Sequence, residues 1–454
     1  MLLLAAAAFV GSAACRPCHL KISEDYAQTP MARSSGRVGT LDPARFTAAG
    51  HRYRIANNRL YFDGGDAPFD YFIGSNTAGR SFLLSRENYL FELPVTWYRD
   101  RRGWDASPGY ERDPEVRLSR AIDPTCLYCH ASRLQPIYGT QNRYADPPFL
   151  EHGVSCERCH GPGGDHVRNP VAARMVNPAK LAPEERDSVC AQCHLTGEAR
   201  IERPGRRFAE YRPGARLSDY VTYLVWKDHD PGMKVTSHVE KLAMSRCRRE
   251  SGGAMWCGTC HEVHSNGNRT QAACLSCHAD AHHASESCAS CHMRHSAASD
   301  VAHGVATDHS IPGARRSAPV GRSLVAFEGA ADDRALGLAY AELGDPRARE
   351  YLLRAQPADA PVLLRLGRYE EVLRRDPANP VALVNLGVVY ARSGRTEDAA
   401  RLWEKALTAN PAIEGAALNL AKISPPDKAR AILTRYLGFN PGSKAAHHAL
   451  EALP

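Results

Sequence analysis

The alternation of apolar and polar residues predicts strands in the first third of the chain. Residues 51–62 alternate in this way on both sides of Asn57-Asn58, a dipeptide that favours the two-residue turn of a hairpin. Aromatic and β-branched runs continue through residues 71–98, where glycines and a proline interrupt them. We therefore predict a small antiparallel sheet at about residues 45–110.

The last part of the chain repeats with the period of paired helices. Eight positions match one tetratricopeptide repeat (TPR) of about 34 residues, namely Leu383, Leu386, Gly387, Tyr390, Ala399, Trp403, Ala406 and Pro411. A second copy has the same offsets at Ala429, Leu433, Tyr436 and Pro441. Small residues let paired helices approach closely, and large aromatic residues fill the space between hairpins. We predict about three helical hairpins, with an unrelated helical bundle as the alternative.

Two segments of different character divide the rest of the chain. Residues 311–325 are rich in Gly, Pro, Ser and Arg, which is typical of a linker. Residues 1–8 are apolar, as in a signal peptide, but no basic residue precedes them; we predict a truncated signal peptide, with a buried helix as the alternative. The predicted domains are then residues 9–310, which hold every cysteine, and the helical repeats of residues 326–454.

Length and composition exclude several classes of protein. A chain of 454 residues makes two or three domains. With 43% hydrophobic and 24% charged residues, it is neither a disordered protein nor a bundle of membrane helices. No apolar run reaches the roughly 18 residues of a membrane span. Aromatic residues make up only 7% of the chain, so a bound apolar group is expected to complete the core.

The cysteines identify that group. Fourteen of the 15 cysteines form seven Cys-x-x-Cys-His motifs, the pattern of covalent c-type haem attachment, where chance predicts roughly 0.02 such motifs. Zinc sites, the alternative, collect ligands in fours and need no His after each second Cys. The predicted attachment residues are Cys15, Cys18, Cys126, Cys129, Cys156, Cys159, Cys190, Cys193, Cys257, Cys260, Cys274, Cys277, Cys288 and Cys291. The predicted proximal iron ligands are His19, His130, His160, His194, His261, His278 and His292.

Distal ligands are available in excess. Eleven histidines before the linker lie outside the motifs, and seven would fill every second axial position. The candidate distal ligands are His152, His166, His238, His264, His283 (or its neighbour His282), His303 and His309. For the first haem, the thioether of Met31 is an alternative ligand.

The sequences around the first and third motifs carry a family resemblance. Val10-Gly-Ser-Ala-Ala-Cys-Arg-Pro-Cys-His and Gly153-Val-Ser-Cys-Glu-Arg-Cys-His-Gly-Pro-Gly resemble multihaem cytochromes c of the cytochrome c-554 and hydroxylamine oxidoreductase type. Together with the C-terminal repeats, the chain is similar to bacterial multihaem cytochromes that carry a TPR domain. The resemblance implies a mainly α fold: a haem-filled helical domain with stacked and perpendicular haem pairs, followed by an α-solenoid. The proteins that the chain resembles include both electron carriers and enzymes.

The formal charge of +7 does not indicate nucleic-acid binding. Seven oxidised haems contribute roughly −7 through their propionates, with which arginines are expected to pair. Cys247 is the one cysteine outside the motifs, and Arg246, Arg248 and Arg249 surround it. These arginines pair with propionates or attract an anionic substrate.

These features predict an exported electron carrier with seven haem c groups, located in the bacterial periplasm or outside the cell. The alternative is a multihaem oxidoreductase in which one iron stays open to a small nitrogen or sulfur oxyanion. We expect redox partner proteins, a peptide or protein docked on the TPR domain, or self-assembly through it, and neither nucleic acid nor a membrane span. If the repeats serve only docking, deletion of residues 325–454 should leave the haem spectrum intact.

Overall fold

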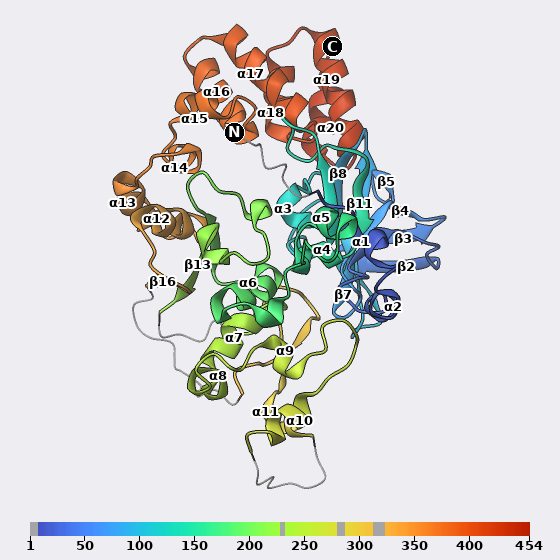
Figure 1. Ribbon diagram of the computed structural model, residues 1–454. Coiled ribbons are helices and arrows are strands. Elements are labelled where there is room, and N and C mark those ends of the chain that lie inside the picture. Colours follow the sequence, from blue (N-terminus) through green and yellow to red (C-terminus); the bar gives the residue numbers. More distant parts are fainter. Residues whose placement is uncertain (1–7, 228–231, 279–286, 312–322) are drawn as a thin grey trace. The chain divides into compact units, whose positions relative to one another are not determined.

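The computed structural model describes residues 8–227, 232–278, 287–311 and 323–454 (Figure 1). The first seven residues of the predicted signal peptide, most of the predicted linker and the candidate ligand His283 lie outside these ranges. Among the residues that are described, no helix has both the length and the apolar composition needed to cross a membrane.

The chain forms two compact units, each assembled from segments that are separate in the sequence. Unit 1 consists of Met1–Ser34, Ala131–Arg133 and Glu151–Tyr351, and unit 2 of Ser35–His130, Leu134–Leu150 and Leu352–Pro454. Six of the seven motifs therefore lie in unit 1, and the second motif lies in unit 2.

Unit 1 is built from short helices and small sheets. Its α-helices are α1 (Ser12–Cys15), α2 (Leu20–Tyr26), α4 (Cys156–His160), α5 (Gly164–Arg168), α6 (Pro183–His194), α7 (His238–Met244), α8 (Arg246–Glu250), α9 (Cys257–Cys260), α10 (Thr270–Leu275), α11 (Cys288–His292) and α12 (Asp333–Glu342). Its strands are β12 (Ala199–Glu202), β13 (Val221–Trp226), β14 (His295–Ala297), β15 (Val305–Thr307) and β16 (Leu324–Ala326), and its 3-10 helices are η1 (Pro178–Lys180), η2 (Phe208–Glu210) and η3 (Leu217–Asp219). Most of these helices are shorter than eight residues and would be unstable alone in water, so they depend on tertiary contacts.

Strand β16 joins the residues that follow the predicted linker to unit 1. It pairs antiparallel with β13, with Leu324 opposite Trp226, and completes the sheet β12-β13-β16. The backbone N–H of Leu324 donates to the buried hydroxyl of Tyr340 at 3.0 Å. Tyr340 lies in α12, so this helix belongs to unit 1, and α13 (Ala348–Arg354) crosses the boundary between the units.

Two antiparallel sheets form the first part of unit 2. One has the order β2-β3-β4-β5 and the other the order β1-β6-β7-β8-β9. Their strands are β1 (Ser35–Arg37), β2 (Ala44–Ala48), β3 (His51–Ala56), β4 (Arg59–Phe62), β5 (Gly65–Pro68), β6 (Tyr71–Ile73), β7 (Gly79–Arg86), β8 (Tyr89–Tyr98) and β9 (Gly103–Ala106). Helix α3 (Pro124–Leu127) and strands β10 (Ala131–Pro136) and β11 (Tyr144–His152) follow. The protein thus combines helices with several antiparallel sheets, and the predicted mainly α class is met only in part.

The predicted hairpin is confirmed. Strands β3 and β4 pair antiparallel with Ala56 opposite Arg59, which leaves Asn57 and Asn58 as a two-residue turn. Both asparagines have positive φ, 51° and 54°, as a type I′ turn requires. Asn58 also accepts the backbone N–H of Leu41 at 2.9 Å, so its side chain fixes the preceding loop to the turn.

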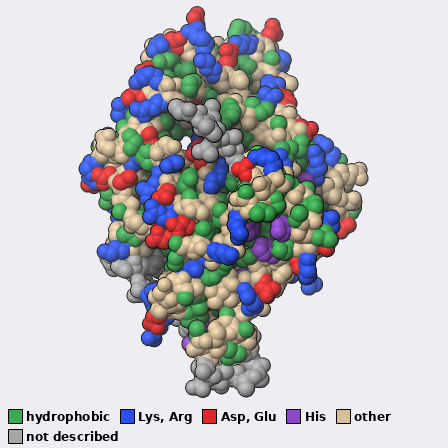
Figure 2. Space-filling model, viewed as in Figure 1, with side chains coloured by type: hydrophobic (Ala, Val, Ile, Leu, Met, Phe, Trp, Pro, Cys, Tyr) green, Lys and Arg blue, Asp and Glu red, His purple; other side chains and the backbone are tan. Residues whose placement is uncertain are grey.

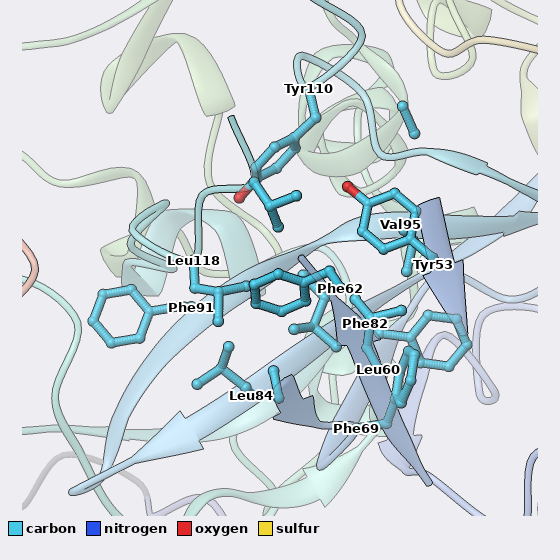
Figure 3. Packing of buried hydrophobic residues seen from close by; sticks show 14 of the residues in the cluster. Tyr53, Leu60, Phe62, Phe69, Phe82, Leu84, Phe91, Val95, Tyr110 and Leu118 are labelled. Atoms are coloured by element: carbon cyan, nitrogen blue, oxygen red, sulfur yellow. The ribbon is translucent and has the colours of Figure 1, made fainter. Parts of the chain in front are cut away.

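The core of unit 2 lies between these two sheets (Figure 3). Phe69 and Phe82 meet edge to face, with ring centres 5.0 Å apart and planes at 86°, a favoured aromatic geometry. Every residue of β8 except Trp97 is buried, although a strand with one face in water would alternate. Other parts of unit 2 therefore cover both faces of this strand.

The C-terminal helices pack as the repeat pattern predicts. They are α14 (Ala360–Arg365), α15 (Tyr369–Arg375), α16 (Pro380–Arg392), α17 (Thr396–Ala409), α18 (Glu414–Lys422), α19 (Pro426–Phe439) and α20 (Lys444–Glu451). Leu383, Ala399 and Trp403 are at most 2% exposed and share one cluster. A Cβ atom on Gly387 would lie 2.4 Å from the Trp403 ring, so glycine is what allows α16 and α17 to approach.

The turns between the TPR helices pack on the sheets of unit 2. Phe439, at the end of α19, is 2% exposed and belongs to the same core cluster as the strands, with Tyr89 and Phe91 each 6.1 Å away between ring centres. The buried Asn440 accepts the backbone N–H of Leu118 at 2.9 Å. The Tyr89 hydroxyl donates to the carbonyl oxygen of Thr408 at 2.8 Å. The repeats therefore pack against other segments of unit 2 in the same chain.

Candidate haem sites

Each motif overlaps or adjoins a helix. Helices α4, α9 and α11 begin at the first cysteine of a motif, and α6 ends at His194. Because residues three apart share one face of a helix, both cysteines of each of these four motifs point to the same side. This arrangement presents two thiols to one edge of a porphyrin, as covalent attachment requires.

Three proximal histidines in unit 1 have a second imidazole at a distance that suits an iron ion. The ring centres are 6.5 Å apart for His19 and His166, 5.7 Å for His160 and His264, and 6.2 Å for His261 and His309. Metal–imidazole bonds are about 2.0 Å long, so two rings on opposite sides of one ion have centres about 6 Å apart. In each pair the second ring is one of the predicted distal candidates.

Backbone carbonyl groups orient three of these rings. The Nδ1 atoms of His160, His166 and His309 lie 2.7, 2.7 and 2.8 Å from carbonyl oxygens of Val176, Ala173 and Thr307. A ring that donates its Nδ1–H to a carbonyl keeps Nε2 free of a proton, ready to bind a metal. The three histidines are thus held in the tautomer that an axial ligand needs.

The fourth motif has a closer pair. His194 and His238 have ring centres 5.1 Å apart, and their Nδ1 atoms are 3.3 Å apart. This spacing is too short for an ion between them, so the rings have to separate before both can bind one iron. Burial, and then the neighbouring histidines, lower the pKa of His194 to about 4 and that of His238 to about 3. Both rings are therefore neutral at pH 7, which is the ligating form.

Apolar side chains are exposed beside these ligands. Leu20 follows His19, Val167 follows His166, and Val263 precedes His264; their exposed fractions are 48%, 48% and 39%. Leu275, between the two cysteines of the sixth motif, is 42% exposed. A porphyrin bound at each site would cover these side chains, so the residues present fit a haem. Figure 2 shows histidine side chains at the surface beside hydrophobic ones.

The other predicted ligands differ from one another in their exposure. His130 is half-buried, and its desolvation lowers its pKa to about 4, whereas His278 and His292 are exposed. The candidates His152 and His303 are exposed as well. Among the residues that the structure describes, no group of three or more His, Cys, Asp or Glu side chains is arranged to hold a metal ion by itself.

Cysteines of different motifs contact one another at three places. At these places burial and then the thiol of Cys156 raise the pKa of Cys15, the thiol of Cys257 raises the pKa of Cys190, and burial and then the thiol of Cys288 raise the pKa of Cys274. Each of these is the first cysteine of its motif. The attachment edges of the first and third haems, of the fourth and fifth, and of the sixth and seventh would therefore adjoin.

The basic cluster around Cys247 is largely engaged with protein groups. Arg246 forms a 2.6 Å ion pair with Glu250. Arg248 pairs with Asp187, and it donates to the backbone carbonyl groups of Gly253 and Met255. These contacts join helix α6 to the segment before the fifth motif, which gives Arg248 a structural role.

Two buried glutamates beside the motifs were not among the sequence predictions. Glu157, inside the third motif, is 1% exposed and accepts hydrogen bonds from three backbone N–H groups. Glu240, two residues after His238, accepts the N–H groups of Thr196 and Gly197, which follow His194. Nothing in the local sequence distinguishes these glutamates from solvated ones, because their donors lie far away along the chain.

Gly153 allows the segment before the third motif to pack against the loop that contains Met31. The N–H of Val154 donates to the carbonyl oxygen of Met31 at 3.0 Å. Gly153 has a φ of +68°, and a Cβ atom there would lie 2.0 Å from the carbonyl oxygen of Ala32. We expect Gly153→Ala to lower the free energy of unfolding by about 2 kcal/mol or more, measured by guanidinium denaturation.

Gly139→Ala is the matched control for this substitution. Gly139 also has positive φ, at +76°, but a Cβ atom there would meet nothing within 4 Å. Its loss of stability should be about 1 kcal/mol, from backbone strain alone. Equal losses for both variants would contradict the close approach at Gly153.

Comparisons with known proteins bear on both halves of the chain. Residues 105–161, which include the second and third motifs, match the family model of cytochrome c554 and c-prime. Residues 380–413, which contain α16 and α17, match the tetratricopeptide repeat model. No curated protein matches the chain.

Two solved structures are similar at low identity. The crystal structure of outer cell wall cytochrome OcwA is 14% identical with a TM-score of 0.44, over 97% of this chain and 99% of that one. The undecaheme cytochrome from the S-layer of Carboxydothermus ferrireducens is 13% identical with a TM-score of 0.33, over 100% of this chain and 71% of that one. From the seven motifs and the two family matches, the chain is a multihaem cytochrome c related to cytochrome c554, with a tetratricopeptide repeat in its C-terminal part.

Proposed function

We propose that the protein is an exported electron-transfer cytochrome that holds seven covalent haems, most of them between two axial histidines. The observation that carries this proposal is the set of three imidazole pairs in unit 1, each with a spacing near 6 Å. They support His166, His264 and His309 as distal ligands of the first, third and fifth haems. His238 is the proposed ligand of the fourth, and His152, His283 and His303 are proposed for the remaining sites.

In this proposal, the residues of the chain fill both axial positions of most haem irons and leave none for a substrate. When bound, each haem supplies an iron ion that cycles between the ferric and ferrous states. Two histidines per iron leave no axial position for a substrate, which favours electron transfer over catalysis. The mutual influence of thiols from different motifs supports a pairwise arrangement of the attachment sites, in which electrons would pass between neighbouring haems.

A second candidate function is an oxidoreductase with one open iron. One observation favours it: within the described part of the chain, no second imidazole ring lies against His278 or His292. An iron at either site would then bind a small oxyanion in place of the missing ligand.

Intact mass and electron paramagnetic resonance (EPR) of the purified holoprotein test the proposal. We expect the mass of seven attached haems and low-spin ferric signals only. Fewer than seven haems would contradict the assigned sites, and a high-spin signal that nitrite or hydroxylamine alters would favour the oxidoreductase. Cell fractionation tests export, because the holoprotein should be found outside the cytoplasm.

The TPR helices are proposed to dock a protein partner as well. The turns at Asn410 and Asn440 contact Gln141 and Leu118 in loops of unit 2, so the opposite part of the repeats is the proposed partner surface. Val381 and Val389, one face of α16, are 50% and 49% exposed and support this choice.

A further inference from the structure

Glu157 is a buried carboxylate inside a haem-attachment motif. It lies between Cys156 and Cys159 and is 1% exposed. Its Oε1 accepts the backbone N–H of Gly163 at 2.7 Å and that of Val10 at 2.9 Å, and its Oε2 accepts the N–H of Gly11 at 2.7 Å. Both oxygens act only as acceptors, as in an ionised carboxylate.

Among the described residues, Glu157 has no ion-pair partner, although the guanidinium of Arg133 lies beside Gly11, 3.1 Å from the Cβ position of that glycine. The hydrogen-bond partners of Glu157 are neutral backbone groups. Glu92, another buried glutamate, forms an ion pair with Arg120, whereas the buried Glu240 resembles Glu157 in accepting backbone N–H groups. Glu157 therefore places a negative charge without an ion-pair partner in a medium where charges are weakly screened.

Glu157 also connects the first and third motifs. Val10 and Gly11 precede the first motif by a few residues, and Glu157 belongs to the third. The contact extends through Ser12, whose hydroxyl accepts the backbone N–H of Cys156 at 3.1 Å, and through the thiols of Cys15 and Cys156. The two attachment sites thus share one buried carboxylate.

We propose that Glu157 is a positioning residue whose fixed negative charge lowers the reduction potentials of the first and third haems. The inference rests on the proposed haem sites and adds to them an assignment of which haems are low in potential. Reduction adds an electron to the haem, and a nearby negative charge opposes that addition more strongly when water is excluded. Each of these two haems would accordingly be harder to reduce than the same haem without the carboxylate.

Two variants test this inference, one by removing the charge of Glu157 and the other by placing an opposite charge beside it. Glu157→Gln removes the charge directly. Val10→Lys supplies an ammonium group while leaving the carboxylate in place; Val10 and the Glu157 carboxylate both lie 3.3 Å from the Cβ position of Gly163. In a potentiometric titration, we expect each to raise two of the seven midpoint potentials. The expected change is about tenfold in the reduction equilibrium constant, or about 59 mV for one electron.

Two further variants are controls. Glu157→Asp keeps the charge, so the midpoint potentials of the first and third haems should lie closer to the wild-type values than in Glu157→Gln. Glu24→Gln removes a solvated carboxylate beside the first motif, where Glu24 pairs with Arg16 and is 55% exposed, so its effect should be small. The haem content of each variant, measured by intact mass, separates a failure of the haem sites from a failure of this inference.

Unchanged potentials in a fully loaded Glu157→Gln protein would overturn the inference and leave Glu157 as a purely structural contact. If Glu157→Gln does not load haem, Val10→Lys decides: unchanged potentials there overturn the inference equally. Increases spread evenly over all seven haems would also overturn it, because a local charge acts on the nearest sites.

Discussion

Replacing His264 by glycine is expected to leave the haem content unchanged and to convert one haem from low spin to high spin. The His264 ring lies 5.7 Å from that of His160, with planes only 11° apart, and the Nδ1 of His160 is held by Val176. Glycine leaves the distal side of the third iron without a ligand, while the two thioethers and His160 still hold the haem. EPR at low temperature should show one new high-spin ferric signal.

His51→Gly is the control for this substitution. His51 lies in unit 2, where its Nε2 is 3.0 Å from the carbonyl oxygen of Asp113, and it is not a proposed ligand. It should leave every haem low spin. A fully low-spin His264→Gly protein would show that another side chain ligates the third iron, whereas restoration of the low-spin signal by added imidazole would support the assignment.

Replacing Phe439 by alanine is expected to destabilise unit 2 by about 3–5 kcal/mol. The Phe439 side chain is 2% exposed, and it fills the space next to Tyr89 and Phe91 at the centre of the cluster. Its removal costs the transfer free energy of an aromatic ring plus the energy of the cavity that remains. The loss is measured from guanidinium unfolding followed by near-ultraviolet circular dichroism.

Leu353→Ala provides a matched comparison, because Leu353 is 63% exposed in the same unit. It should change the free energy of unfolding by less than about 0.5 kcal/mol. Equal effects of the two substitutions would contradict the packing of α19 on the sheets.

The same packing changes what deletion of the repeats is expected to do. From the sequence, removal of residues 325–454 should leave the haem region unaffected. In the structure, that deletion removes Phe439 and Ala412 from the core of unit 2 and most of β16 from the sheet β12-β13-β16. We therefore expect the truncated chain to be unstable, seen as low yield and increased proteolysis, so partner docking is better tested with surface substitutions at Val381 and Val389.

Local features of the fold were predictable, because each depends on residues close together in sequence. The turn at Asn57-Asn58 needs two residues that tolerate positive φ. The fit of Gly387 against Trp403 is set within one repeat. The extent of the strands was less predictable: β8 is buried almost throughout, so the alternation that identifies a half-exposed strand is absent from it.

For the haem sites too, the local features were predictable from the sequence and the long-range ones were not. Haem attachment is encoded in five consecutive residues, since the thiols and the proximal imidazole have to reach one porphyrin. The pairing of His160 with His264 joins residues far apart in the chain. Before the linker, the sequence has more histidines outside the motifs than there are distal positions to fill. Only folding could select among them, because each ring requires a partner about 6 Å away across one iron.

By itself, the sequence determined that this is a multihaem cytochrome with C-terminal repeats, because covalent attachment and helix pairing are short-range requirements. The tertiary structure decided which imidazoles face each other, that the repeat turns complete the core of unit 2, and that Glu157 is buried with no ion-pair partner among the described residues. These features arise from contacts between distant segments. Local residue patterns do not encode such contacts, since burial and electrostatic environment exist only after the segments have packed together.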